Sequence, residues 1–162
     1  MGAPTGFKAA LEVLARHQVE LIVVGGVAAV VNGAPIATFD LEVVHARSAA
    51  NLERLMAALR DLDARYRDPA GRVLRPEIAA LAGDGHHLLL TRCGPVDVLG
   101  RIGNERRYED LLPDSFAIAV GDISVRVLNL ATLIPTKEEA GRDKDRVVLA
   151  LLRETLREAG KS

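Results

Sequence analysis

The short apolar run Leu21–Val24 stops at the pair Gly25-Gly26, and this junction constrains the fold more than any other feature of the chain. A run of β-branched and aliphatic residues of this length predicts a buried strand, and the two glycines predict a tight turn after it. Apolar residues at helical spacing predict a helix on each side, over 5–17 and 27–32. A strand between helices is typical of a sheet covered by helices, so we expect an α/β or α+β protein.

The rest of the chain continues this alternation. Residue spacing predicts further helices, a strand and two β-hairpins: a helix capped by Ser48 and running to Leu62, a short helix begun by Pro76, a helical turn at 108–112, a helix capped by Asn129 that Pro135 kinks or restarts, a helix over 143–159, a strand over 40–45, and hairpins over 87–99 and 116–128. We expect one domain over 1–162, with a mixed β-sheet flanked by helices. Its core would span about 5–128, and a helical segment would follow over about 129–160.

Composition excludes several classes of protein. The formal net charge of −1 argues against nucleic-acid binding by bulk electrostatics, and an aromatic content of 3% disfavours recognition by base stacking. The single cysteine, Cys93, excludes an intrachain disulfide and a multi-cysteine zinc site, which fits a cytoplasmic protein. The longest apolar candidate, 19–34, is interrupted by polar and glycine residues, and no run reaches the ~20 residues that span a bilayer.

Three acidic residues in predicted strands are candidate metal ligands. Asp40 and Glu42 stand two positions apart, so their carboxylates point to the same face of a strand, where a hard divalent cation would relieve their repulsion. Asp97 lies in an apolar strand and is costly to bury without a partner. Together the three acids could hold two Mg²⁺ (or Mn²⁺) ions for phosphoryl chemistry, with Asp97 placed to accept a proton. The alternative is that these acids lie on a solvated strand face.

Two further features suit an anionic substrate. Gly25 and Gly26 let backbone amides approach a phosphate, although a glycine pair is also a simple tight turn. Lys137 and Arg142 lie in a cluster of mixed charge and could neutralise a triphosphate, or form a solvated helix surface.

Other candidates carry weaker signals. His86-His87 opens a predicted strand without metal-ligand spacing, which favours a structural role. Arg101, Arg106 and Arg107 could bind an acidic acceptor, and an exposed loop explains them equally well.

These pieces occur in an order that resembles the minimal nucleotidyltransferases of the DNA polymerase β superfamily. Their hallmark is a Gly-Gly or Gly-Ser turn, then D-x-[DE] on the next strand, then a third carboxylate on a neighbouring strand. Here Asp40 follows Gly26 by 14 positions, and the resemblance extends through 96–99 and 133–145, from about Leu11 to Leu152. The chain is most similar to small prokaryotic members related to abortive-infection and toxin–antitoxin nucleotidyltransferases.

The resemblance implies a role for each motif. Gly25 and Gly26 would hold nucleotide phosphates, and Asp40, Glu42 and Asp97 would bind metal, with Asp97 as general base. Lys137 would contact the triphosphate, supported by Arg142 and Asp145. The reaction would move a nucleoside monophosphate from an NTP to a hydroxyl and release pyrophosphate. Only 34 residues follow Leu128, so the acceptor would be a partner protein or RNA bound by the core, by a homodimer or with a partner's help.

Three positions depart from the family pattern: Glu42 replaces the commoner aspartate, Ile36 stands where many relatives carry arginine, and Val27 where active members often place serine. They support an alternative hypothesis, a catalytically degenerate binding module of the same fold that acts as an antitoxin-like or regulatory partner. A purely structural α/β domain would require the motif matches to be chance.

Overall fold

The computed structural model describes residues 5–161. Their strands are β1 (Leu21–Val24), β2 (Leu41–His45), β3 (Arg65–Tyr66), β4 (His86–Thr91), β5 (Gly94–Leu99), β6 (Ser115–Val120) and β7 (Ile123–Leu128). Their helices are α1 (Thr5–Arg16), α2 (Gly25–Val31), α3 (Ala49–Asp61), α4 (Ile78–Leu81), α5 (Tyr108–Leu111), α6 (Leu130–Ala140) and α7 (Arg146–Ala159), with 3₁₀ turns at Leu112–Asp114 and Asp143–Asp145.

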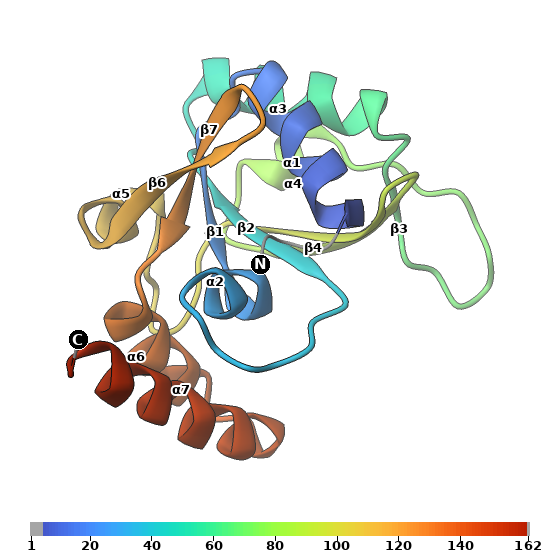
Figure 1. The fold of residues 1–162 in the computed structure, drawn as a ribbon. Helices are drawn as coiled ribbons and strands as arrows, with labels where there is room; N and C mark the ends of the chain where they lie inside the picture. The colour runs from blue at the N-terminus through green and yellow to red at the C-terminus, as the bar shows by residue number, and fades with distance from the viewer. Residues whose placement is uncertain (1–4, 162) are drawn as a thin grey trace.

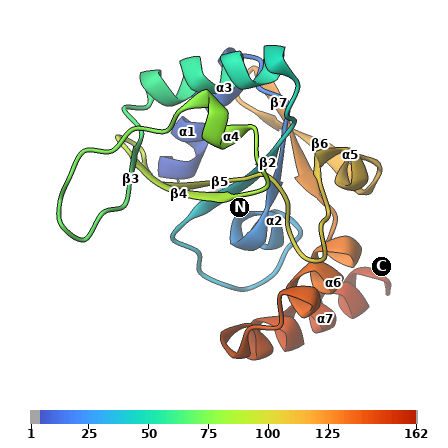
Figure 2. The same ribbon diagram turned by 180° about the vertical axis from the view of Figure 1, so that it is seen from behind.

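The strands form one mixed sheet in the order β3-β4-β5-β2-β1-β7-β6. Helices α1, α3 and α4 lie on one side of this sheet, and α2, α6 and α7 lie on the other (Figures 1 and 2). The chain is therefore a mixed α/β single domain, which confirms the predicted fold class. The predicted domain includes positions 1–4 and 162, which lie outside the described residues, and its division near residue 128 stays a prediction.

The core lies around the central strands, because these have neighbours on both edges and helices on both faces. Ile22 and Val23 of β1, Leu41 and Val43 of β2, and Val98 of β5 are fully buried. Near-continuous apolar runs are expected for strands covered on both faces. The acids at positions 40, 42 and 97 interrupt these runs, and this makes the centre of the sheet the place to look for a site.

Strand register decides which side chains meet. β1 and β2 are antiparallel, with Val24 opposite Glu42, whereas β2 and β5 are parallel, with Glu42 opposite Asp97. The parallel pairing requires a long crossover, and the chain supplies it through α3, β3, α4 and β4. Residues 55 positions apart thereby become neighbours across the sheet.

The ends of several helices match the local sequence signals. The Ser48 side chain accepts a hydrogen bond from the Asn51 amide at the start of α3, and Asn129 accepts one from Thr132 at the start of α6. Both are N-caps, which satisfy backbone donors left free in the first helical turn. The two caps were predicted as such.

Three elements differ from the expectation. α2 begins at Gly25 rather than Val27, because Gly25 adopts a left-handed backbone (φ +65°) that turns the chain directly into the helix. α6 runs through Pro135 instead of restarting there, with Leu133 and Ile134 buried beside it. β3 was not predicted, because two residues are too short for a periodic signal and the strand exists only through its pairing with β4.

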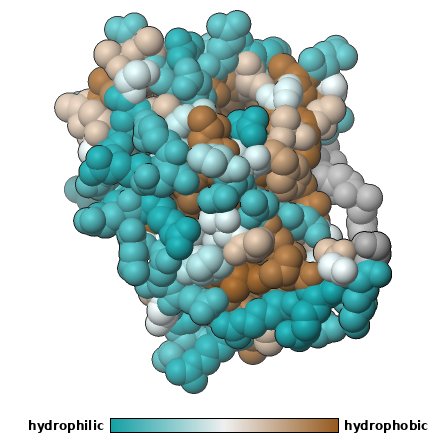
Figure 3. Space-filling model, turned by 90° about the vertical axis from the view of Figure 1, so that its left-hand side faces the viewer, coloured by the Kyte–Doolittle hydropathy of each residue, from teal (hydrophilic) through white to brown (hydrophobic). Residues whose placement is uncertain are grey.

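The surface near β6 is mixed in polarity. Figure 3 views this side and shows hydrophobic residues gathered across the middle of the face, above a hydrophilic lower edge. Residues of α1, α2 and the β6–β7 hairpin line an apolar groove of about 320 Å³. None of the helices in residues 5–161 combines the length and apolarity needed to cross a membrane.

Candidate functional site

The three predicted acids lie on neighbouring strands. Asp40 directly precedes β2 and Glu42 lies within it, so both side chains point to one face of the sheet. Asp97 lies in β5 directly opposite Glu42, and residues opposed on neighbouring strands are about 5 Å apart. Asp97 is 5% exposed, whereas Asp40 and Glu42 are partly exposed. The structure thus brings all three acids to one part of the sheet.

Asp97 is the most perturbed of these groups. Burial raises the pKa of Asp97 to about 6, and the nearby charges of Glu42 and Asp40 act in the same direction. The guanidinium of Arg67 opposes this rise. A carboxylate with a pKa near neutrality is suited to accept a proton at physiological pH.

The glycine turn lies against the acids. An added Cβ at Gly25 would overlap the Glu42 carboxylate and lie 2.7 Å from its Cδ atom. An added Cβ at Gly26 would overlap the Thr38 hydroxyl and lie 2.7 Å from the Thr38 Cβ. The glycines therefore have a structural task besides any phosphate contact, since they leave room for the side chains of Glu42 and Thr38.

Arg67 is a member of this site that the sequence did not reveal. Its Nη2 atom lies 2.5 Å from Oδ1 of Asp97 and 4.0 Å from Oδ1 of Asp40. Its Nε atom donates to the Leu89 carbonyl at 3.2 Å. Residue 67 belongs to a stretch that the sequence marks only as charged and glycine-containing. Its position depends on the pairing of β3 with β4, for which the sequence carries no local signal.

The predicted triphosphate residues form a separate cluster. Lys137 Nζ lies 3.7 Å from Oδ1 of Asp145, and Arg142 Nε donates to Oδ2 of Asp145 at 2.9 Å. Asp145 is buried, so these two cations neutralise it. No hydrogen bond or ion pair among residues 5–161 joins this cluster to Asp40, Glu42 or Asp97. The role of Lys137 and Arg142 toward a nucleotide stays a prediction.

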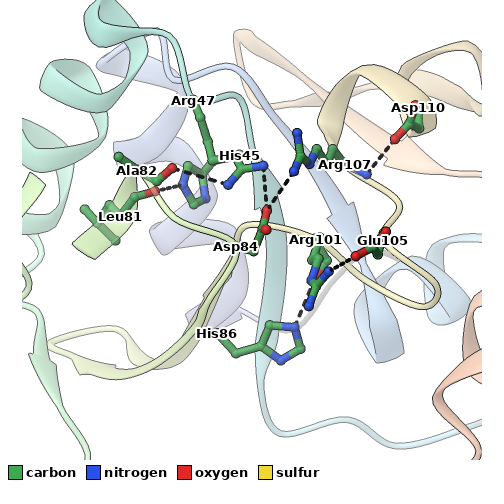
Figure 4. Close-up of polar contacts among 10 residues, drawn as sticks. All are labelled: His45, Arg47, Leu81, Ala82, Asp84, His86, Arg101, Glu105, Arg107 and Asp110. Carbon is green, nitrogen blue, oxygen red and sulfur yellow. Dashed lines mark hydrogen bonds and ion pairs between the residues drawn. The ribbon is translucent and has the colours of Figure 1, made fainter. Parts of the chain in front are cut away.

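The remaining arginine candidates have carboxylate partners within the chain (Figure 4). Asp84 Oδ1 lies 2.7 Å from Nη2 of Arg47 and 3.5 Å from Nη2 of Arg107. Arg101 pairs with Glu105 at 2.8 Å. Outside that view, Arg106 donates two hydrogen bonds to Glu139, at 3.0 and 2.6 Å.

The two histidines also make contacts within the chain. The His86 ring bonds to the Arg101 carbonyl at 3.0 Å. The His87 ring bonds to the Tyr66 hydroxyl at 2.8 Å. These contacts tie β3, β4 and the segment after β5 together, in accord with the structural role favoured above.

The donor chemistry of the acid cluster suits a hard divalent cation, because carboxylate oxygens are the preferred ligands of such ions. The arrangement differs from that of a ready metal site. No three His, Cys, Asp or Glu side chains in the described part of the chain are placed to hold one metal ion. Arg67 already bonds to Asp97 and approaches Asp40. As placed, the three acids do not surround one ion, and Arg67 is the cation that lies beside Asp97 and Asp40.

Comparison with known proteins shows a fold relationship. No protein-family model and no curated protein sequence matches the chain. Its structure is similar to the crystal structure of a Thermotoga maritima protein described as a "putative nucleotidyltransferase", with a TM-score of 0.59 and 15% sequence identity. The match covers 98% of this chain and 96% of that one. The chain therefore has a nucleotidyltransferase-like fold over nearly its whole length.

Proposed function

We propose that this protein is a metal-dependent nucleotidyltransferase of the DNA polymerase β superfamily. It moves a nucleoside monophosphate from an NTP to a hydroxyl of a partner protein or RNA. The observation that carries the proposal is the register of β2 and β5, which sets Glu42 beside Asp97 next to the Gly25 turn. The similarity to a nucleotidyltransferase-like fold supports it.

In this reaction the acceptor hydroxyl oxygen bonds to the α-phosphorus of the NTP. The bond from that phosphorus to the oxygen bridging to the β-phosphorus breaks, and pyrophosphate leaves. The hydroxyl proton goes to the Asp97 carboxylate, which lies opposite Glu42 in the acid cluster. Bound Mg²⁺ or Mn²⁺, held by Asp40, Glu42 and Asp97, would neutralise charge on the transferring phosphoryl group.

The phosphates would lie against the start of α2. Gly25 and Gly26 lack the Cβ atoms that would keep a ligand away from the backbone, and α2 begins at Gly25. Lys137 and Arg142 would contact the triphosphate end. Since both cations pair with Asp145 in the structure, they are held in a fixed place on the α6 side of the protein.

The test measures transfer of label from α-labelled NTPs, with Mg²⁺ or Mn²⁺, to the protein itself, to RNA and to proteins purified with it. We expect transfer by the wild type and by the control Asp122→Ala, which removes an acid from the exposed β6–β7 turn. The double variant Asp40→Ala, Glu42→Ala should show only background. If that variant transfers as much label as the wild type, the proposal is wrong.

The ion pair between Arg67 and Asp97 supports a second candidate function. A catalytically degenerate module could keep its acids neutralised by an internal cation and act as an antitoxin-like or regulatory partner. The setting we propose for the nucleotidyltransferase, and equally for this alternative, is a toxin–antitoxin or phage-defence system in the cytoplasm, with the protein alone or as a homodimer. Calorimetry that detects neither NTP nor Mg²⁺ binding, together with a tight protein complex, would favour this candidate.

A further inference from the structure

Arg67 is anchored to the sheet by two hydrogen bonds. Its backbone amide donates to the Leu88 carbonyl at 3.1 Å, and its Nε donates to the Leu89 carbonyl at 3.2 Å. Both carbonyls belong to β4, the strand next to β5. The side chain therefore reaches across β4 toward Asp97, and β4 fixes its direction.

The guanidinium supplies the positive charge of the acid cluster. It lies 2.5 Å from Asp97 and 4.0 Å from Asp40, and no other Lys, Arg or His among residues 5–161 forms an ion pair with Asp40, Glu42 or Asp97. A buried carboxylate is costly without such a partner. Arg67 thus occupies the electrostatic position that a divalent cation would take.

We infer that Arg67 is an internal cation that competes with the divalent metal for Asp97. It thereby raises the metal concentration at which Asp40, Glu42 and Asp97 bind the metal. This inference rests on the proposed function. A guanidinium and a divalent cation on the same carboxylate repel each other, because both are positive and only a few ångströms apart. The Arg67 guanidinium at Oδ1 of Asp97 therefore weakens metal binding, and a bound metal ion would displace Arg67 from Asp97. Arg67 is a positioning residue in this scheme, since it acts through Asp97.

The experiment uses Mn²⁺ alone as the probe and follows free Mn²⁺ by electron paramagnetic resonance. Arg67→Met removes the competing charge, and we expect it to bind Mn²⁺ at least about tenfold more tightly than the wild type. Arg75→Met is the matched control. It removes an arginine of the same exposed segment, one that pairs with Asp63 at 2.6 Å, and should bind Mn²⁺ as the wild type does. Adding Asp97→Asn to Arg67→Met should abolish the gain.

A second measurement needs no substitution. The Arg67 Nε–H cross-peak, followed by NMR in the wild-type protein, should shift on addition of Mg²⁺, whereas that of Arg75 should not. A wild type and an Arg67→Met variant with equal affinity, a weaker variant, or an unmoved Arg67 peak at saturating metal would each overturn the inference and leave the proposed function intact. Absence of Mn²⁺ binding in both proteins would overturn the inference and the proposed metal-dependent function together.

Discussion

The substitution Gly25→Ala tests whether the glycine turn exists to make room for Glu42. Gly25 has φ +65°, a conformation that costs a residue with a Cβ about 1–2 kcal/mol. The new methyl group would also overlap the Glu42 carboxylate, so this side chain must leave its position. Moving a side chain off its preferred rotamer costs about 0.5–1.5 kcal/mol. The expected loss of unfolding free energy is therefore about 1.5–3.5 kcal/mol.

Gly121→Ala is the control for backbone strain alone. Gly121 has φ +62°, and an added Cβ would meet its nearest atom, Glu12 Oε1, at an ordinary 3.8 Å. This variant should lose only about 1–2 kcal/mol. Since 1 kcal/mol corresponds to about 2–4 °C in a chain of this size, Gly25→Ala should melt about 3 °C below Gly121→Ala in thermal unfolding followed by circular dichroism.

A double-mutant cycle isolates the contact. In a Glu42→Ala background the overlap is gone, so Gly25→Ala should cost no more than Gly121→Ala does. Equal melting temperatures for the two glycine variants in the wild-type background would refute this account of the turn. An extra loss of stability for Gly25→Ala that persists in the Glu42→Ala background would refute it as well.

Two further predictions concern stability. Burial lowers the pKa of His45 below 6.5, with the charges of His87 and Arg47 acting in the same direction and the Leu81 carbonyl opposing them. At a pH between the pKa of His45 in the folded protein and 6.5, only the unfolded chain binds a proton at this residue. The contribution of neutral His45 to the free energy of unfolding is therefore full above about pH 6.5 and is lost as the pH falls. His45→Gln should therefore narrow the difference in melting temperature between about pH 8 and about pH 5.5, and an unchanged difference would contradict the assignment. Asn51 is fully buried and makes three hydrogen bonds to the backbone of Glu20 and Ala46, so Asn51→Ala should cost about 2–4 kcal/mol in urea unfolding. Asn129→Ala removes only an N-cap and should cost about 1 kcal/mol, and a larger loss there than at Asn51 would show that the buried network contributes little.

Local chemistry explains why much of the fold could be predicted. Apolar residues at a period of 3.6 or 2 mark helices and strands wherever an element is long enough to repeat the pattern, as in α3, β2 and α7. Side chains such as Ser48 and Asn129 mark helix starts because they satisfy free backbone donors directly. β3 and the first residues of α2 were not predicted. Pairing with β4 places β3, and the left-handed Gly25 places the start of α2, so neither depends on periodicity.

Some features of the candidate site could likewise be predicted from the sequence, whereas others depend on the tertiary structure. The spacing of Asp40 and Glu42 by itself determined that both carboxylates share one face of a strand, because side chains alternate along any strand. Only the tertiary structure decided that Glu42 lies beside Asp97 and that Arg67 reaches Asp97 across β4. Both contacts join segments at least 30 residues apart through sheet pairing. Long-range pairing depends on how the whole chain packs, so no local pattern in the sequence encodes the internal cation that neutralises these acids.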